Sequence, residues 1–129
     1  MTDRVRLVAG IGFRHAATVE EIVDLIGRAL AEAEFAPDAL AAIATAADRA
    51  GEDVCRAAAA AFGLKPVAVS PDALAAVDAG VVTRSARIAA SRGVGSVAEA
   101  AALAAAGPNA RLLLPRIASA GATCALAAS

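Results

Sequence analysis

Three short apolar runs in this chain are each followed by a segment whose apolar residues recur at helical spacing. The runs cover residues 5–9, 40–45 and 66–69, and the helical segments begin near residues 18, 48 and 72. Strand, helix, strand, helix, strand is the order typical of an α/β sheet with helices on its faces. The first run stops at Gly10, so we expect a strand that enters a tight loop there.

The end of the chain has a different pattern. A helix is expected over residues 96–106, and two more apolar runs follow at 111–114 and 123–127. About eight residues separate these last runs, whereas a parallel crossover needs a dozen or more. The whole pattern, over residues 1–129, predicts one domain: a three-layer α/β/α sandwich with about five strands. Its mixed sheet should be mostly parallel, with an antiparallel pair at the C-terminus.

Polar residues mark where three helices should begin. Thr18 and Ser96 are each followed three positions later by a glutamate, Glu21 and Glu99, which is the capping-box pattern. Ser70 precedes a proline, which also favours a helix start. The capping pattern gives Glu99 a structural explanation. The segment from 81 to 95 has no regular pattern, although it holds three arginines.

The composition argues against nucleic acid as a partner. The chain is 59% hydrophobic, but 41 of its 129 residues are alanine, and it has three Phe with no Trp or Tyr. Base stacking needs aromatic platforms, which are scarce here. The net charge of −1 does not provide a broad electrostatic grip on DNA or RNA either.

Cysteine usage and hydropathy indicate a cytoplasmic protein. Cys55 and Cys124 each lie in an apolar run, where a reduced thiol behaves as a small hydrophobe. We expect both to be unpaired in a reducing compartment. The start of the chain does not resemble a signal peptide, and glycine or proline interrupts the longest uncharged stretches, so no membrane span is expected.

The glycines after the first run suggest an anion site. Gly10 and Gly12 begin a G-x-G pattern, but His15 stands where the third glycine of a dinucleotide fingerprint would be, and Thr45 replaces the acidic residue. One interpretation is that the glycines only let the backbone turn. The other is that their N–H groups, with Arg14 and His15, bind a carboxylate near a helix N-terminus.

No metal, cofactor or catalytic pattern emerges from the sequence. His15 is the only histidine, and no cluster of metal ligands surrounds it, so it is either a solvated loop residue or a contact to an acidic ligand. The candidate bases His15, Asp48, Glu52 and Glu99 do not lie beside an evident nucleophile.

Two arginines are further candidates for ligand binding. Arg49 follows the second predicted strand at a helix start, where a cation is not favoured by the helix dipole, so it is either a surface residue or a ligand contact. Arg116 precedes a loop of small residues, 117–121, between the last two predicted strands. A surface arginine is again the alternative.

Several segments together resemble a known family. These are Val8 to Arg14, Ala44-Thr45 with Arg49 and Glu52, Gly93 to Leu103, and Gly121 to Ala127. The chain is similar to CobE and the C-terminal domain of CbiG, from cobalamin biosynthesis, over nearly its whole length. It departs from the family pattern at Arg49, where lysine is usual, and lacks a Pro-Ser-Glu-like sequence near residues 83–85.

The resemblance implies an accessory or carrier protein that binds a precorrin or corrin intermediate, with other enzymes of the pathway as further partners. The alternative is a hydrolase, because CbiG is associated with opening the lactone of cobalt-precorrin-5A. Such intermediates carry many carboxylates, so cations and backbone donors should line the site. Arg84 and Arg87 could add to those cations. The residues expected to bind the ligand are Gly10, Gly12, Phe13, Arg14, His15, Thr45, Arg49, Glu52, Ser96, Glu99 and Arg116.

Overall fold

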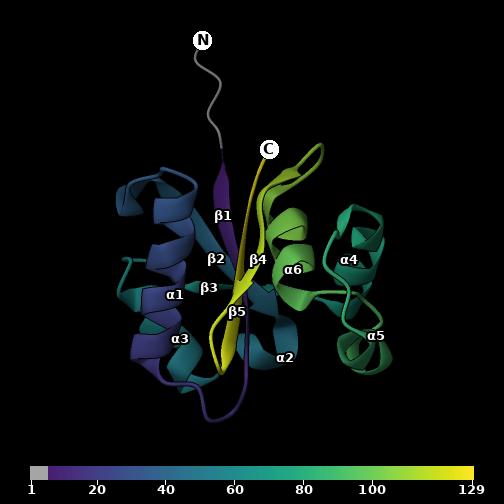
Figure 1. Cartoon of the computed structure of the whole chain (residues 1–129), viewed down its shortest axis with the longest axis horizontal. Helices are drawn as coiled ribbons and strands as arrows, with labels where there is room; N and C mark the ends of the chain where they lie inside the picture. The colour runs from purple at the N-terminus through teal and green to yellow at the C-terminus, as the bar shows by residue number, and fades with distance from the viewer. Residues whose placement is uncertain (1–5) are drawn as a thin grey trace.

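The computed structural model describes residues 6–129, apart from the side chains of residues 87, 91 and 92. A five-stranded sheet has the order β3-β2-β1-β5-β4 (Figure 1). Its strands are β1 (Leu7–Phe13), β2 (Leu40–Ala46), β3 (Pro66–Val69), β4 (Arg111–Ala118) and β5 (Ala122–Ala128). The pairs β1–β2 and β2–β3 are parallel, whereas β1–β5 and β4–β5 are antiparallel. β5 is therefore the one reversed strand of the sheet, and the predicted mixed sheet is confirmed.

Helices cover both faces of the sheet. Helices α1 (Val19–Glu32) and α3 (Asp53–Ala60) lie on one face, and α6 (Val97–Ala106) lies on the other (Figure 1). Helices α4 (Pro71–Ala76) and α5 (Ala86–Arg92) lie outside α6, on the same side. The short helix α2 (Ala47–Ala50) follows β2, and two 3-10 turns cover Pro37–Ala39 and Asp78–Gly80. The three layers agree with the prediction.

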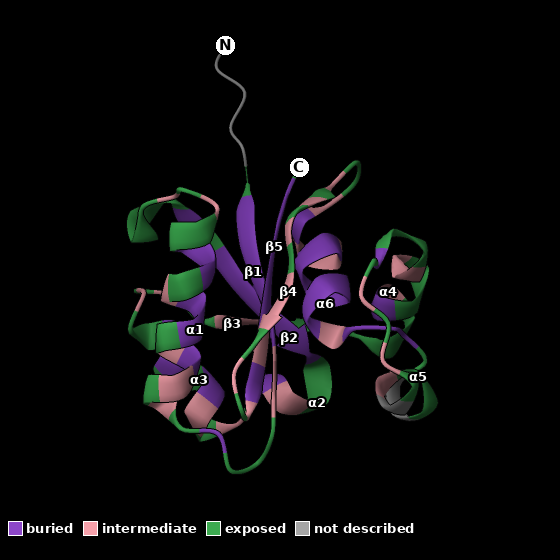
Figure 2. Cartoon of the chain, in the orientation of Figure 1, coloured by how far each residue is buried: buried purple, intermediate pink, exposed green. Residues whose placement is uncertain are grey.

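Strand β1 lies in the centre of the sheet and contributes to both cores. Leu7, Ala9 and Ile11 pack with α1 and α3, whereas Val8 points to the core under α6. All four are at most 1% exposed (Figure 2). Full burial of a Leu, Ile or Val side chain contributes about 1.5–3 kcal/mol. Val5, where the strand was expected to start, lies outside the described residues.

The expected glycine loop is wrong, because Gly10 and Gly12 lie within β1. Gly10 pairs with Ala44 of β2 and Ala125 of β5, so its backbone belongs to the sheet. A Cβ atom at Gly10 would lie 1.9 Å from the carbonyl oxygen of Ala98 on α6. The glycine therefore permits close contact between the strand and the helix, and an anion-binding turn is not formed there.

The helix starts agree with the sequence. The side chains of Thr18, Ser70 and Ser96 each accept a hydrogen bond from the backbone N–H three residues later. The helical segment expected to begin near residue 48 is divided into α2 and α3. Helix α5 forms in the segment expected to be irregular, where Ser85 caps its start and Gly93 ends it with φ of 74°.

Both cysteines are free and buried, as predicted: Cys55 lies on α3 and Cys124 on β5. Burial raises the pKa of Cys55 to about 11 and that of Cys124 to about 12. Within residues 6–129, the structure has no helix that combines the length and apolar character needed to cross a bilayer.

Candidate binding cleft

A cleft of about 610 Å³ lies at the carboxyl ends of β1 and β2. The other walls come from the starts of α5 and α6 and from the hairpin that joins β4 to β5. The carboxyl edge of parallel strands is where ligands bind in open α/β sheets. The lining residues are Gly12, Phe13, Arg14, His15, Thr45, Ala46, Arg49, Ser85, Ile88, Ser96, Val97, Arg116, Ala118, Ser119, Ala120, Gly121, Ala122 and Thr123.

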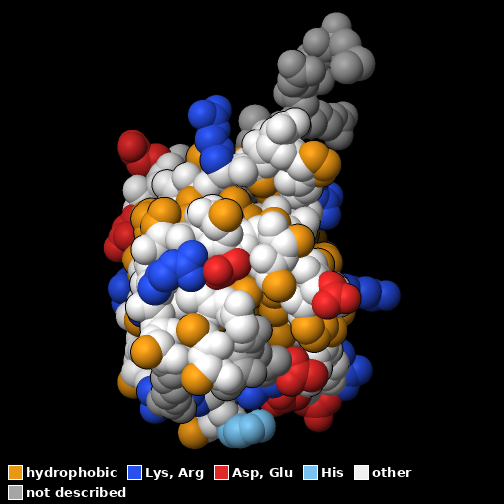
Figure 3. Space-filling view, turned by 90° about the vertical axis from the view of Figure 1, so that its right-hand side faces the viewer, with side chains coloured by type: hydrophobic (Ala, Val, Ile, Leu, Met, Phe, Trp, Pro, Cys, Tyr) orange, Lys and Arg blue, Asp and Glu red, His pale blue; other side chains and the backbone are white. Residues whose placement is uncertain are grey.

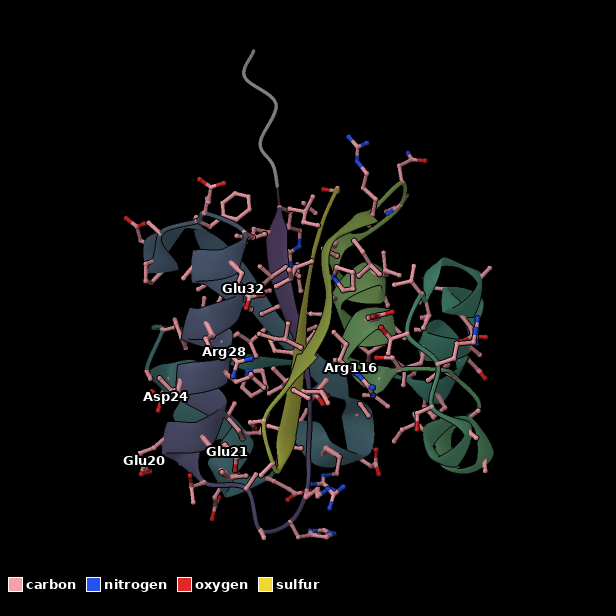
Figure 4. All side chains as sticks on the ribbon, in the orientation of Figure 1. Glu20, Glu21, Asp24, Arg28, Glu32 and Arg116 are labelled. Carbon is pink, nitrogen blue, oxygen red and sulfur yellow. The ribbon has the colours of Figure 1, made fainter. Side chains whose placement is uncertain are left out.

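The charged side chains among the described lining residues are arginines. Arg14, Arg49 and Arg116 line the cleft together with His15, and none of the described lining residues is acidic. Arg14 and His15 are exposed on the segment between β1 and α1, and Figure 3 shows the histidine projecting at one end of the molecule. Arg116 is half-buried on β4, beside the start of α6 (Figure 4). The lining therefore attracts anionic groups such as carboxylates.

Arg49 is tied to the end of β1. Its Nη2 donates a 2.8 Å hydrogen bond to the carbonyl oxygen of Phe13, and its guanidinium carbon lies 4.4 Å from the centre of the Phe13 ring. Its Nε is 2.5 Å from Oε2 of Glu52, which makes an ion pair but no hydrogen bond at that nitrogen. Because Glu52 offsets its charge and the side chain is 16% exposed, Arg49 is mainly a structural cation.

Two threonines support the same end of β1. The hydroxyl of Thr45 is buried and donates a 2.7 Å hydrogen bond to the carbonyl oxygen of Ile11. Thr123 Oγ1 lies 3.4 Å from the carbonyl oxygen of Gly12, to which it donates a longer bond. Thr45 therefore forms part of the cleft floor while its hydroxyl proton is already engaged.

Glu99 is fully buried and holds three backbone segments together. Its Oε1 accepts hydrogen bonds from the N–H groups of Val82 at 2.8 Å and Thr83 at 3.0 Å, and its Oε2 accepts one from Arg116 at 2.9 Å. Burial acts to raise the pKa of this carboxyl, but the hydrogen bonds from Arg116, Thr83 and Val82 outweigh it and lower the pKa. Glu99 thus stays ionised behind the cleft wall.

The start of α6 also faces the cleft through Ser96 and Val97. Ser96 is buried, and its Oγ accepts a 3.3 Å hydrogen bond from the N–H of Glu99. The first N–H groups of a helix carry a partial positive charge. This end of α6 adds to the positive potential from the arginines.

The structure brings eight of the eleven predicted residues to the cleft: Gly12, Phe13, Arg14, His15, Thr45, Arg49, Ser96 and Arg116. Gly10, Glu52 and Glu99 do not line it, because Gly10 is buried under α6, Glu52 pairs with Arg49 and Glu99 holds backbone N–H groups. Arg84, an expected cation of the site, instead pairs with Asp78 at 3.1 Å. The side chain of Arg87 lies outside the described part of the chain.

The sequence interpretation missed the connection between α1 and the hairpin. Oε2 of Glu21 accepts hydrogen bonds from the hydroxyl of Ser119 at 2.5 Å and from the N–H of Gly121 at 2.6 Å. The Ser119 bond, followed by the Gly121 bond, lowers the pKa of Glu21. The capping pattern explains Glu21 locally, and nothing in that pattern indicates a partner 98 residues away. Glu21 therefore fixes the hairpin turn that forms one wall of the cleft.

The fold, with its cleft at the carboxyl edge of the parallel strands, defines the class of protein: an α/β protein with an open, mixed five-stranded sheet. The family model described as "Cobalamin synthesis G C-terminus" matches residues 7–127, and the chain belongs to this family. It is therefore a protein of cobalamin biosynthesis, as the resemblance indicated.

Individual relatives agree with this assignment. The chain is 38% identical over 121 residues to Protein CobE of Sinorhizobium sp, which covers 94% of this chain and 79% of the relative. The crystal structure of CobE from the cobalamin biosynthetic pathway matches with a TM-score of 0.93 at 30% identity, covering 100% of this chain and 94% of the other. The cobalamin biosynthesis protein chiG from Agrobacterium tumefaciens matches with a TM-score of 0.73 at 35% identity, over 94% and 96% of the two chains.

A longer relative matches over only part of its length. A cobalamin biosynthesis protein G homologue from Sulfolobus solfataricus has a TM-score of 0.70 at 25% identity, and the match covers 96% of this chain but 37% of the other. The fold of this chain thus corresponds to one portion of that larger protein.

Proposed function

We propose that the chain binds a precorrin or corrin intermediate in the cleft and acts as an accessory or carrier protein. The observation that carries this proposal is the distribution of charge: three arginines, one histidine and no described acidic residue line one cleft of about 610 Å³. The intermediates of the pathway are macrocycles with many carboxylate arms. Charge-assisted hydrogen bonds to such arms are stronger than neutral ones.

The rest of the lining suits the faces of a macrocycle. Phe13, Ile88 and Val97 contribute apolar surface, together with the alanines of the β4–β5 hairpin. Ligand sites generally combine an apolar surface with a few well-placed polar groups. Ser85 and Ser119 also line the cleft, the first before α5 and the second in the hairpin, where its hydroxyl donates to Glu21.

The protonation states favour binding over catalysis. Glu21 and Glu99 both have a pKa below the usual range and hold backbone or hydroxyl donors, so they are not proton donors at neutral pH. His15 is the one described lining residue with an imidazole, the side chain that most often serves as a general base. The alternative, a hydrolase acting on a precorrin-5-type intermediate, would use His15 as the base that activates water.

An absorbance titration with purified pathway intermediates tests this proposal. A saturable spectral shift with no later change is expected for a carrier, whereas a slow further change would show turnover and favour the hydrolase. Absence of a shift with every intermediate would refute binding. The enzymes that supply and receive the intermediate would be the partners of this chain. A cytoplasmic location of the chain agrees with its two free thiols.

Two variants connect binding to the cleft. Arg14→Ala and Arg116→Ala each remove one cation, and each should weaken binding about tenfold or more, since a hydrogen bond to a charged group is worth about 1.5–3 kcal/mol. Arg28→Ala is the matched control, because Arg28 is exposed on α1 and does not line the cleft (Figure 4). Equal affinity for all three variants would exclude this cleft.

A further inference from the structure

The cleft has few cations to offer a polycarboxylate. Of its three described arginines, Arg49 is already paired with Glu52. Arg14, His15 and Arg116 remain, and none of their side chains has an acidic partner in the described part of the chain. The described lining residues therefore offer two free arginines and one histidine to the carboxylates of a ligand.

These three residues lie at two separate positions. The backbone N–H of Arg14 donates to the carbonyl oxygen of Gly121, which places Arg14 and His15 at the hairpin turn. Arg116 precedes Ile117, which is opposite Cys124, whereas Phe13 is opposite Ala122. With a rise of about 3.3 Å per residue, the backbones of Arg14 and Arg116 are about 13 Å apart along β5, and about 10 Å apart across the sheet because β1 and β4 flank β5. This separation suits two different carboxylate arms of a macrocycle.

The volume of the cleft also limits how much of a tetrapyrrole it can enclose. Pockets of about 300–1,000 Å³ enclose drug-sized ligands. A tetrapyrrole with acetate and propionate arms on its rings is larger than a drug-sized ligand, so a cleft of about 610 Å³ encloses only part of it.

Complete enclosure would also bury unpaired charge. A macrocycle with carboxylates on every ring has more of them than the cleft has free cations. Each carboxylate that enters without a cation or hydrogen-bond donor loses its hydration, which costs free energy. The surplus arms are therefore more stable in water than in the cleft.

We infer that this chain holds its tetrapyrrole by one edge, with Arg14, His15 and Arg116 on two or three carboxylate arms and the opposite edge projecting into solvent. This inference rests on the proposed function and adds the orientation of the ligand. A second protein can bind the projecting edge while this chain still holds the other edge. The macrocycle can then be transferred directly between the two proteins without dissociating into solvent.

Fluorescence quenching of a bound tetrapyrrole tests the inference. The probe is uroporphyrin, a fluorescent tetrapyrrole with carboxylate arms on every ring, and the quencher is acrylamide, which is neutral. Binding is measured first by fluorescence anisotropy, and the number of chains per porphyrin by analytical ultracentrifugation. Edge binding predicts one chain per porphyrin and a quenching constant lowered by less than about twofold, whereas full enclosure of roughly 70–90% of the ligand predicts about fivefold or more.

The possible outcomes distinguish failure of the edge-binding inference from failure of the proposed function. Binding with strong protection from acrylamide, or two chains enclosing one porphyrin, would overturn the edge arrangement and leave the proposed function standing. Failure of uroporphyrin and of every pathway intermediate to bind would overturn both. Arg14→Ala and Arg116→Ala should each weaken uroporphyrin binding, while Arg28→Ala should not. If only one of Arg14→Ala and Arg116→Ala weakens uroporphyrin binding, the inference that the ligand is held at two positions is overturned.

Discussion

The backbone N–H of Arg116 on β4 donates a 2.9 Å hydrogen bond to the buried carboxylate of Glu99 on α6. The same carboxylate accepts from Val82 and Thr83, so one side chain joins the helix, the segment before α5 and an edge strand. The position of Arg116 in the cleft wall therefore depends on a residue that does not face the cleft.

Removing this carboxylate should destabilise the fold. Glu99→Ala leaves three backbone N–H groups without their acceptor, and each unsatisfied buried donor costs about 1–3 kcal/mol. We expect the free energy of unfolding, measured by urea denaturation, to fall by about 3–5 kcal/mol. The control is Glu32→Ala, since Glu32 is exposed on α1. Equal stability of the two variants would contradict the anchoring role of Glu99.

Acid should weaken the protein through three carboxylates. The Ser119 bond lowers the pKa of Glu21, the N–H of Gly95 lowers that of Asp78, and Glu99 has a low pKa because its hydrogen bonds outweigh its burial. In each case the folded pKa is below the ordinary value of 4.5 for glutamate or 3.8 for aspartate. Their stabilisation is therefore complete above those values and lost as the pH falls through the folded pKa.

Urea denaturation between about pH 7 and about pH 3 measures this effect. Wild-type stability should decline below the ordinary carboxyl values, and Glu99→Gln, which cannot ionise at that position, should show a shallower decline. Parallel curves for the two proteins would show that the ionisation of Glu99 is not linked to folding.

A methyl group at Gly10 should disrupt the contact between β1 and α6. The added Cβ would lie 1.9 Å from the carbonyl oxygen of Ala98 and 2.6 Å from the N of Ala102, both backbone atoms that cannot move independently. Overpacking of a core costs about 1–3 kcal/mol, and we expect Gly10→Ala to exceed this range. The melting temperature of the variant, compared with that of wild type, measures this loss of stability.

The matched control is Gly27→Ala on α1, where nothing lies within 4 Å of the new Cβ. Alanine in a helix is favoured over glycine by about 1 kcal/mol, so this variant should be slightly more stable than wild type. A Gly10→Ala protein as stable as Gly27→Ala would show that α6 can shift without cost.

Arg49→Ala should affect stability, although the sequence pointed to either a surface residue or a ligand contact. It removes the donor to the Phe13 carbonyl oxygen, the ring contact and the partner of Glu52. We expect a loss of about 1–3 kcal/mol in the free energy of unfolding, because the carbonyl is left partly buried without its donor. Arg14→Ala, at an exposed side chain, should change stability by at most about 0.5 kcal/mol. A larger loss of stability in Arg14→Ala than in Arg49→Ala would mean that the Arg49 side chain is available to bind the ligand.

The sequence alone determined the five strands and most of the helices of this fold, but not α5. Thr18, Ser70 and Ser96 specify helix starts because a cap bonds an N–H three residues away, and this local interaction can be read from a short stretch of chain. The short connection before β5 determined that the last pair is antiparallel, since it cannot cross over the sheet. The same local reasoning placed most of the cleft, because the carboxyl ends of parallel strands meet at one edge.

Only the tertiary structure decided what several of these residues do. Gly10 was taken for a turn because a glycine motif does not show whether a helix will lie on it, and α6 comes from residues nearly ninety positions later. Glu21 and Glu99 fitted their caps, yet each carboxylate also reaches donors that are 16 to 100 residues away. Arg49 and Arg116 had the same sequence interpretation, and their roles separate because Glu52 and Phe13 hold the first while the second has no acidic partner among the described residues. Capping and periodicity act over one turn of helix or a few residues of strand, whereas these pairings depend on which elements the folded chain brings together.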